Sequence, residues 1–147
     1  MSLDQKVYEG ALAIVYKKQE GSENKFLLVK NKETDNISFV AGGKEESDTD
    51  TTETLIREIQ EELGLNVSRH KITSTGLKHE FVFNKKKKGR EGGKGEYDVF
   101  LIDASDIENI TPIGVEQIMW ETAERVENLL SFEDLKEVFN RAIKLIE

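Results

Sequence analysis

The 147 residues fit one domain, and a hydrophobic fraction of 37% beside a charged fraction of 34% predicts a real core with a strongly charged surface. The formal charge of -8 argues against general affinity for DNA or anionic lipid, and no apolar run is long enough to span a bilayer. The absence of cysteine excludes disulfides and thiolate chemistry and suits a cytoplasmic protein. We therefore expect a single cytoplasmic domain over residues 1–147, as a monomer or a homodimer.

The N-terminal third predicts a hairpin and a further short strand. Residues 8–18 and 25–31 are apolar and contain β-branched side chains, and the segment between them is polar and contains glycine. Residues 37–43 have the pattern of a strand that ends in two glycines, Gly42 and Gly43. We expect the two longer strands to pair and the glycines to begin a loop.

Residues 51–63 predict an amphipathic helix with a marked beginning and end. Aliphatic side chains recur on one side of it, at Leu55, Ile56, Ile59 and Leu63. Asp50 is a suitable N-cap with Glu53 as its capping-box partner, and Gly64 stands where a left-handed C-cap belongs. The helix is therefore expected to begin after Asp50 and to end before Gly64.

The C-terminal half predicts two more strands, 77–84 and 96–103, followed by helix. Residues 85–95 ("KKKKGREGGKG") contain six basic residues, one acidic residue and four glycines, which predicts a mobile loop. A short strand is expected at Trp120, and apolar side chains then follow at helical spacing: Phe132, Leu135, Val138, Phe139, Ala142, Ile143 and Ile146. Strands mixed with two or three helices predict an α/β sandwich around a mixed β-sheet.

Three carboxylates share one face of the predicted helix 51–63. Glu58, Glu61 and Glu62 cover about 100° of its surface, and Glu58 faces a like charge four residues later. Clustered carboxylate oxygens suit a hard cation such as Mg²⁺, which takes its remaining ligands from water and substrate phosphates. A solvated acidic face that binds nothing is the simpler alternative, but the preceding glycines and the neighbouring arginine favour a site.

The spacing of these residues resembles the Nudix box of the Nudix hydrolases, G-x5-E-x7-R-E-U-x-E-E-x-G-U with U aliphatic. Residues 43–65 match eight of its nine specified positions: Gly43, Arg57, Glu58, Ile59, Glu61, Glu62, Gly64 and Leu65. The resemblance implies a Nudix-type α/β/α sandwich with a mixed β-sheet. It also implies a pyrophosphohydrolase that needs Mg²⁺ or Mn²⁺ and cleaves a nucleoside diphosphate linked to another group.

The resemblance also assigns expected roles to single residues. Glu58 and Glu62 are the principal metal ligands, Glu61 is a further or water-mediated ligand, and the Gly42 carbonyl is a backbone ligand. Arg57 orients Glu58, so the expected catalytic residues include Arg57, Glu58 and Glu61. Family members often take the general base from a later loop, where Glu116 is the best-placed candidate, with Glu80 and His79 as alternatives.

Thr49 is the one departure from the box, because it stands where the family has its first glutamate. In the family that glutamate contacts the box arginine, which Thr49 cannot do ionically. Either Asp48 or Asp50 supplies the charge after a small shift, or Thr49 caps the helix and leaves Arg57 looser. The second outcome favours a catalytically weak nucleotide-binding regulatory module over an enzyme.

Substrate choice stays open between several nucleotide classes. Gly43, Phe81 and Tyr97 are expected to contact substrate, and Lys87 in the basic loop 85–95 is expected to reach distal phosphates, although a merely solubilising loop is an alternative. Residues 116–146 resemble the C-terminal part of diadenosine polyphosphate hydrolases of the family, which favours a dinucleoside polyphosphate. A nucleoside triphosphate, ADP-ribose or a nucleotide sugar, and an RNA 5′ end are the alternatives.

Overall fold

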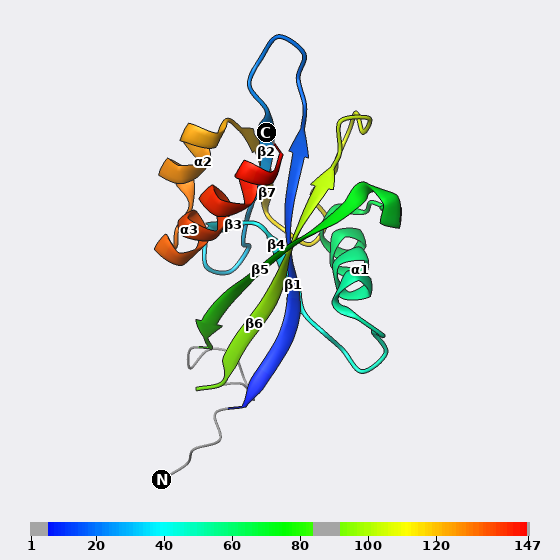
Figure 1. Cartoon of the computed structure of the whole chain (residues 1–147), viewed down its shortest axis with the longest axis vertical. Helices are drawn as coiled ribbons and strands as arrows, with labels where there is room; N and C mark the ends of the chain where they lie inside the picture. Colours follow the sequence, from blue (N-terminus) through cyan, green and yellow to red (C-terminus); the bar gives the residue numbers. More distant parts are fainter. Residues whose placement is uncertain (1–5, 84–91, 147) are drawn as a thin grey trace.

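The computed structural model describes residues 6–83 and 92–146. Its strands and α-helices follow the chain in this order (Figure 1): β1 (Val7–Lys17), β2 (Lys25–Lys30), β3 (Ile37–Ser38), β4 (Val40–Gly43), α1 (Thr51–Leu63), β5 (Ile72–Val82), β6 (Lys94–Asp103), β7 (Gln117–Glu121), α2 (Ala123–Leu129) and α3 (Glu133–Ala142). Two short 3-10 helices precede β5 and follow α3, at Arg69–Lys71 and Ile143–Leu145. Within the described ranges, no helix is long and apolar enough to cross a membrane.

The strands form one mixed sheet, as expected. Its main order is β3-β2-β1-β6-β5, while β4 pairs with β1 and β7 pairs with β2. β1 and β6 run parallel from Val7 opposite Lys94 to Tyr16 opposite Asp103, whereas the other pairs are antiparallel. The predicted hairpin is confirmed, because Tyr16 of β1 lies opposite Phe26 of β2.

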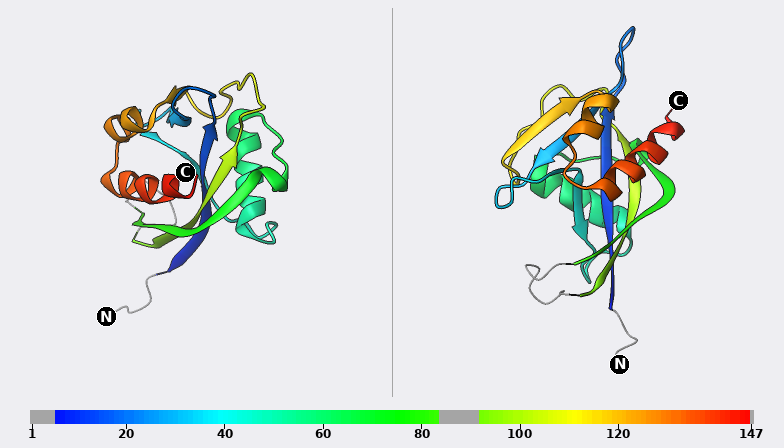
Figure 2. Two further views of the ribbon diagram at one scale, coloured as in Figure 1. Left: turned by 45° about the horizontal axis from the view of Figure 1, so that its top comes forward. Right: turned by 90° about the vertical axis from the view of Figure 1, so that its left-hand side faces the viewer.

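The sheet is covered on both faces, which gives the α/β/α sandwich (Figure 2). Along β1, alternate side chains belong to two separate cores, as the period of a strand requires. One set packs with the α1 residues Leu55, Ile59 and Leu63: Ala11, Ala13 and Val15. The other set packs with residues of α2 and α3 such as Val126 and Phe139: Leu12 and Ile14. The continuous apolar run of β1 is therefore explained by burial on both sides.

Several predicted boundaries were wrong because pairing with distant segments decides them. The segment 37–43 is two strands, since β3 pairs with β2 and β4 pairs with β1. β5 begins at Ile72, and the irregularity in its pairing between Ser74 and Lys78 contains Gly76, whose φ is 75°. Lys94 and Gly95 belong to β6 instead of the basic loop. Residues 85–91 of the expected mobile loop lie outside the described residues.

The C-terminal helical pattern is divided into α2 and α3 by a contact with β3. The Ser131 N–H donates to the Ile37 carbonyl oxygen at 3.1 Å, and the Ser131 hydroxyl oxygen accepts from the Ile37 N–H at 2.8 Å. Leu130 has an extended backbone at the end of α2, with ψ of 134°. The chain therefore leaves the helical path at Leu130 and re-enters it after Phe132.

Candidate active site

The two ends of α1 are fixed by local hydrogen bonds, as predicted. The Asp50 carboxylate accepts from the Glu53 N–H at 2.9 Å, and Gly64, with φ of 67°, donates its N–H to the Gln60 carbonyl oxygen at 2.9 Å. The capping box differs in one respect, because Glu53 accepts from the Thr49 N–H at 2.8 Å instead of the Asp50 N–H. These bonds hold the middle of α1 beside the glycines of β4.

The Arg57 side chain connects four acidic residues of the site to one another and to β4. Its guanidinium contacts one carbonyl oxygen and four carboxylates: Gly43 O (Nη2, 3.0 Å), Asp48 (Nη2–Oδ2, 2.9 Å), Glu58 (Nη1–Oε1, 3.1 Å), Glu61 (Nη1–Oε1, 3.3 Å) and Glu45 (Nη1–Oε2, 3.5 Å). A planar guanidinium suits this role because its donors leave in fixed directions. Arg57 thus joins the glycine loop to α1 and contacts Glu58, as an orienting role for that glutamate requires.

Asp48 takes the place of the carboxylate that the box lacks at Thr49. Both of its oxygens face Arg57, since Nε approaches Oδ1 at 3.4 Å and Nη2 approaches Oδ2 at 2.9 Å. The Glu45 N–H and the Thr54 hydroxyl donate to the same carboxylate at 2.9 and 3.0 Å. The bond from Arg57, followed by the one from Glu45, lowers the pKa of Asp48 to about 2. Arg57 is therefore not left loose by the substitution at Thr49.

Glu58 lies directly against the backbone of β4. A Cβ atom built on Gly42 would overlap the Glu58 carboxyl group, so only glycine leaves room for this carboxylate. Burial raises the pKa of Glu58 to about 7, although Arg57 beside it acts in the opposite direction, and the like charges of Glu61 and Glu62 add to the rise. The positive charge of Arg57 therefore does not offset the burial of the Glu58 carboxylate and the negative charges beside it.

Glu62 has a carboxylate oxygen that lacks a hydrogen-bond partner among the described residues. This oxygen is the buried atom Oε2. The Glu62 backbone carbonyl accepts from the Ile113 and Gly114 N–H groups at 2.9 and 3.1 Å, which ties the loop before β7 to the end of α1. Burial and then the charge of Glu61 raise the pKa of Glu62, with Lys32 opposing them. Buried polar atoms are rarely left unpaired, so this oxygen suits a cation or its bound water.

The predicted metal ligands do not all converge on one point. Within residues 6–83 and 92–146, no three His, Asp or Glu side chains converge closely enough to hold a metal ion. Glu58 and Glu61 share the Arg57 Nη1 atom, and the Glu61 side chain is 56% exposed. Mg²⁺ commonly takes only one or two protein carboxylates and completes its shell with water and phosphate. The unpaired oxygen of Glu62 and the confined carboxylate of Glu58 fit that pattern.

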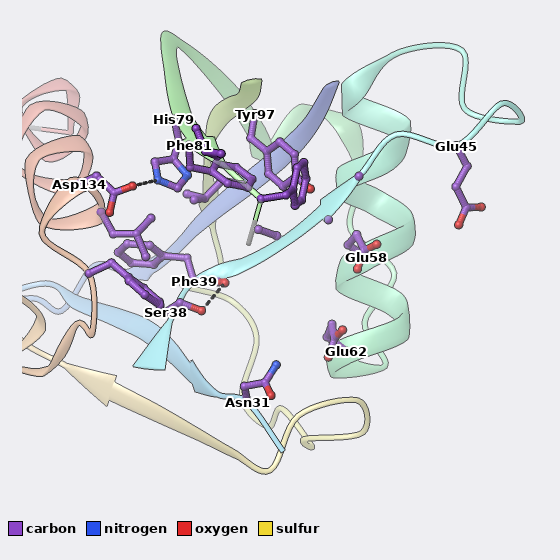
Figure 3. Close-up of a pocket in the computed structure, with 18 residues that line it drawn as sticks. Asn31, Ser38, Phe39, Glu45, Glu58, Glu62, His79, Phe81, Tyr97 and Asp134 are labelled. Carbon is purple, nitrogen blue, oxygen red and sulfur yellow. Dashed lines mark hydrogen bonds and ion pairs between the residues drawn. The ribbon is translucent and has the colours of Figure 1, made fainter. Parts of the chain in front are cut away.

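A pocket of about 840 Å³ extends from these carboxylates to the C-terminal helix (Figure 3). Gly42, Gly43, Glu58 and Glu62 line one end of it, whereas His79, Phe81 and Asp134 line the other. At that far end, His79 Nε2 lies 2.7 Å from Asp134 Oδ2, and the His79 ring stacks on Phe81 with a centroid distance of 5.0 Å. Tyr97 lines the pocket between the two ends and meets Phe81 edge to face at 4.9 Å.

The structure brings most of the predicted site residues together, with two exceptions. Gly43, Phe81 and Tyr97 line the pocket, as a contact with substrate requires. Glu116 is absent from the described pocket lining and pairs with Lys30 Nζ at 3.3 Å, so its assignment as general base stays a prediction. Lys87 lies outside the described residues.

Asp134 is a pocket residue that the sequence did not indicate. It lies in the first turn of α3, where an acidic residue is ordinary, and its partner His79 is 55 positions away. Asp48 was one of two candidates for the missing charge, and only its pairing with Arg57 decided between them. No local pattern identifies either contact.

Comparisons with known proteins agree with this geometry. A model of the NUDIX domain matches residues 8–145. The fold is similar to the E. coli dihydroneopterin triphosphate pyrophosphohydrolase, with TM-score 0.76 and 18% identity over 95% of this chain and 99% of that one. It is also similar to a C. elegans Ap4A hydrolase, with TM-score 0.73 and 13% identity over 95% of this chain and 97% of that one.

A third similar structure contains a ligand. The NUDIX domain of Shewanella oneidensis NrtR, complexed with ADP ribose, has TM-score 0.73 and 13% identity over 97% of this chain and 89% of that one. No curated protein sequence matches the chain. The family match covers nearly the whole sequence, and the chain therefore belongs to the Nudix family. It is a pyrophosphohydrolase of pyrophosphate-containing substrates, and Nudix hydrolases generally use divalent metals such as Mg²⁺.

Proposed function

We propose that the chain hydrolyses a phosphoanhydride bond in a nucleoside diphosphate-linked substrate, with a dinucleoside polyphosphate as the leading candidate. The observation that carries this proposal is the continuous pocket with carboxylates at one end and aromatic rings at the other. Phosphates that bind through a cation fit the carboxylate end, and a nucleobase can stack at the aromatic end. The likeness of residues 116–146 to diadenosine polyphosphate hydrolases supports the leading candidate.

The strand register gives the separation of two residues that line opposite ends of the pocket. Four residues lie side by side across β4, β1, β6 and β5: Gly43, Gly10, Tyr97 and His79. Three interstrand spacings of about 4.8 Å each separate the first from the last by about 14 Å. A nucleotide lying across these strands can place its base at His79 and its phosphates at Gly43. The arrangement supports binding one nucleoside in the pocket, with its phosphates directed to the carboxylate end.

The chain's own residues have distinct tasks in this proposal. Glu58 and Glu62, with the Gly42 carbonyl, hold Mg²⁺ or Mn²⁺, which when bound neutralises the phosphates and lowers the pKa of a bound water. Arg57 keeps Glu58 at its place, because Asp48 and the Gly43 carbonyl fix the guanidinium. Phe81 offers an aromatic surface to the base. Glu116 stands as the proposed general base, on a half-exposed side chain.

A substrate panel tests the proposal. Wild type and Glu62→Gln are incubated with Mg²⁺ or Mn²⁺ and a dinucleoside tetraphosphate, a nucleoside triphosphate, ADP-ribose or an RNA with a 5′ triphosphate. We expect the highest kcat/KM on the dinucleoside tetraphosphate and loss of turnover in Glu62→Gln. Turnover of another class alone refutes the leading candidate. Nucleotide binding without turnover of any compound refutes hydrolysis in favour of a binding module.

A further inference from the structure

The far end of the pocket contains one prominent hydrogen-bond acceptor. His79 is buried on β5, whereas the Asp134 side chain on α3 is 49% exposed and lines the pocket. The two meet at the end opposite Glu58 and Glu62 (Figure 3). Among the described lining residues there is no lysine or arginine to neutralise this carboxylate. The site thus offers negative charge where a nucleobase is expected.

His79 is the hydrogen-bonding partner of that carboxylate. An ionised carboxylate only accepts hydrogen bonds, so the 2.7 Å contact fits the His79 tautomer whose Nε2–H donates to Asp134 Oδ2. Across the part of the chain that the structure describes, His79 is the hydrogen-bonding partner of Asp134 Oδ2, and no residue donates a hydrogen bond to Oδ1. Each carboxylate oxygen can accept more than one bond, so the group keeps capacity for donors from a ligand.

The surrounding walls suit a flat ring. Phe81 lies nearly parallel to His79, with an interplanar angle of 24°, and the neighbouring apolar wall includes Phe39 and Leu135. The Ser38 hydroxyl also lines the pocket and donates its proton to the Phe39 carbonyl oxygen at 3.2 Å. This end of the pocket therefore combines aromatic side chains with a half-exposed carboxylate.

We propose that Asp134 is a specificity-determining residue that selects a nucleobase of the guanine type. The edge of guanine places its N1–H and its 2-amino group side by side, so two donors meet two carboxylate oxygens. Adenine and cytosine place a ring-nitrogen lone pair beside the amino group, and uracil places a carbonyl on each side of its N–H. Those lone pairs are repelled by a carboxylate. This inference rests on the proposed placement of the nucleotide, with its base at His79.

Equilibrium binding tests base choice without requiring turnover. Calorimetry with Mg²⁺ compares GDP, IDP and ADP on the wild type, where IDP keeps the ring N–H and lacks the 2-amino group. A bidentate base contact predicts GDP binding about tenfold or more tighter than ADP, with IDP between them. Asp134→Asn, which still accepts from His79, should reduce the GDP preference to about threefold or less. Glu133→Gln, at the adjacent exposed position, should leave the preference unchanged.

The outcomes separate base recognition from catalysis. Equal affinity for GDP and ADP in the wild type, or an unchanged preference in Asp134→Asn with an unchanged melting temperature, overturns the role of Asp134. The same comparison with Gp4G and Ap4A as substrates should give the same preference in kcat/KM. Glu62→Gln should abolish turnover of both compounds while retaining the preference for GDP. If the wild type shows no turnover, the hydrolytic proposal fails, while the calorimetry still decides base choice.

Discussion

The pairing of Asp48 with Arg57 gives the sharpest prediction about this variant Nudix box. Replacing Asp48 with asparagine keeps the shape of the side chain but removes the charge that faces Arg57. The guanidinium would then be free to turn toward Glu58 and Glu61, which it already contacts at 3.1 and 3.3 Å. We expect Asp48→Asn to lower both stability and kcat, because Arg57 holds the Gly43 carbonyl as well as Glu58.

The size of the stability loss follows from the carboxyl pKa. Lowering it from 3.8 to about 2 corresponds to about 2.5 kcal/mol at neutral pH. Arg57 is 22% exposed, so screening by solvent reduces the expected loss to about 1 to 2 kcal/mol. For a chain of this size, that loss lowers the melting temperature by about 2 to 8 °C.

Melting curves against pH test the cause of the loss. A carboxyl group whose pKa is lowered by folding stabilises the protein above its unfolded pKa of 3.8, and this contribution disappears as the pH falls toward 2. The melting-temperature difference between wild type and Asp48→Asn should therefore be constant above about pH 5 and shrink below pH 4. A difference that does not change with pH would mean that charge is not the cause.

Placing a glutamate at position 49, where the family has it, tests whether Asp48 replaces that residue. In the Asp48→Asn background, Thr49→Glu should recover part of kcat, because glutamate is longer than threonine and can bring a carboxylate from the loop to Arg57. The single variant Thr49→Glu should leave activity equal or higher, since the exposed Thr49 side chain is separate from the Arg57 network and its N–H alone binds Glu53. Wild-type stability and turnover in Asp48→Asn would refute the reasoning, as would a failure of the double variant to recover.

Three further substitutions test the packing around the carboxylates. Gly42→Ala should lower kcat by about a hundredfold with the fold intact by circular dichroism, because the new methyl group displaces the Glu58 carboxylate. Gly114→Ala should weaken Mn²⁺ binding about tenfold in calorimetry, since its Cβ would lie 2.5 Å from Glu62 Oε2. Thr54→Val should cost about 1 kcal/mol in denaturant unfolding, because the buried Asp48 carboxylate loses a donor. Wild-type values in any of these assays would contradict the corresponding contact.

Local signals predicted the parts of the fold that local contacts determine. The bounds of α1 follow from the cap at Asp50 and the left-handed Gly64, both within hydrogen-bonding reach of the helix itself. The division of 37–43 into β3 and β4 depends instead on two different partner strands. The break between α2 and α3 depends on Ser131 contacting Ile37, 94 positions away. Such long-range contacts leave no periodic pattern in the sequence.

In the site too, local spacing predicted some contacts, and the tertiary fold determined the others. The Nudix box predicted that Arg57, Glu58 and Glu61 lie together, because its spacing places them within about one turn of α1, and Arg57 contacts both glutamates. The box could not show that Asp48 replaces the missing glutamate, since a carboxylate one residue earlier reaches Arg57 only through the path of the loop. The aromatic end of the pocket needs β5 and α3 side by side, which only the tertiary fold provides.

The central claim is that Glu62 and Glu58 hold the divalent cation on which hydrolysis depends. Calorimetric titration of Mn²⁺ into the wild type, Glu62→Gln and the exposed loop variant Glu46→Gln tests it most directly, with turnover measured on the same samples. We predict that Glu62→Gln weakens Mn²⁺ binding by about tenfold or more and abolishes turnover, while Glu46→Gln matches the wild type. Equal Mn²⁺ affinity and equal turnover in the wild type and Glu62→Gln would contradict it.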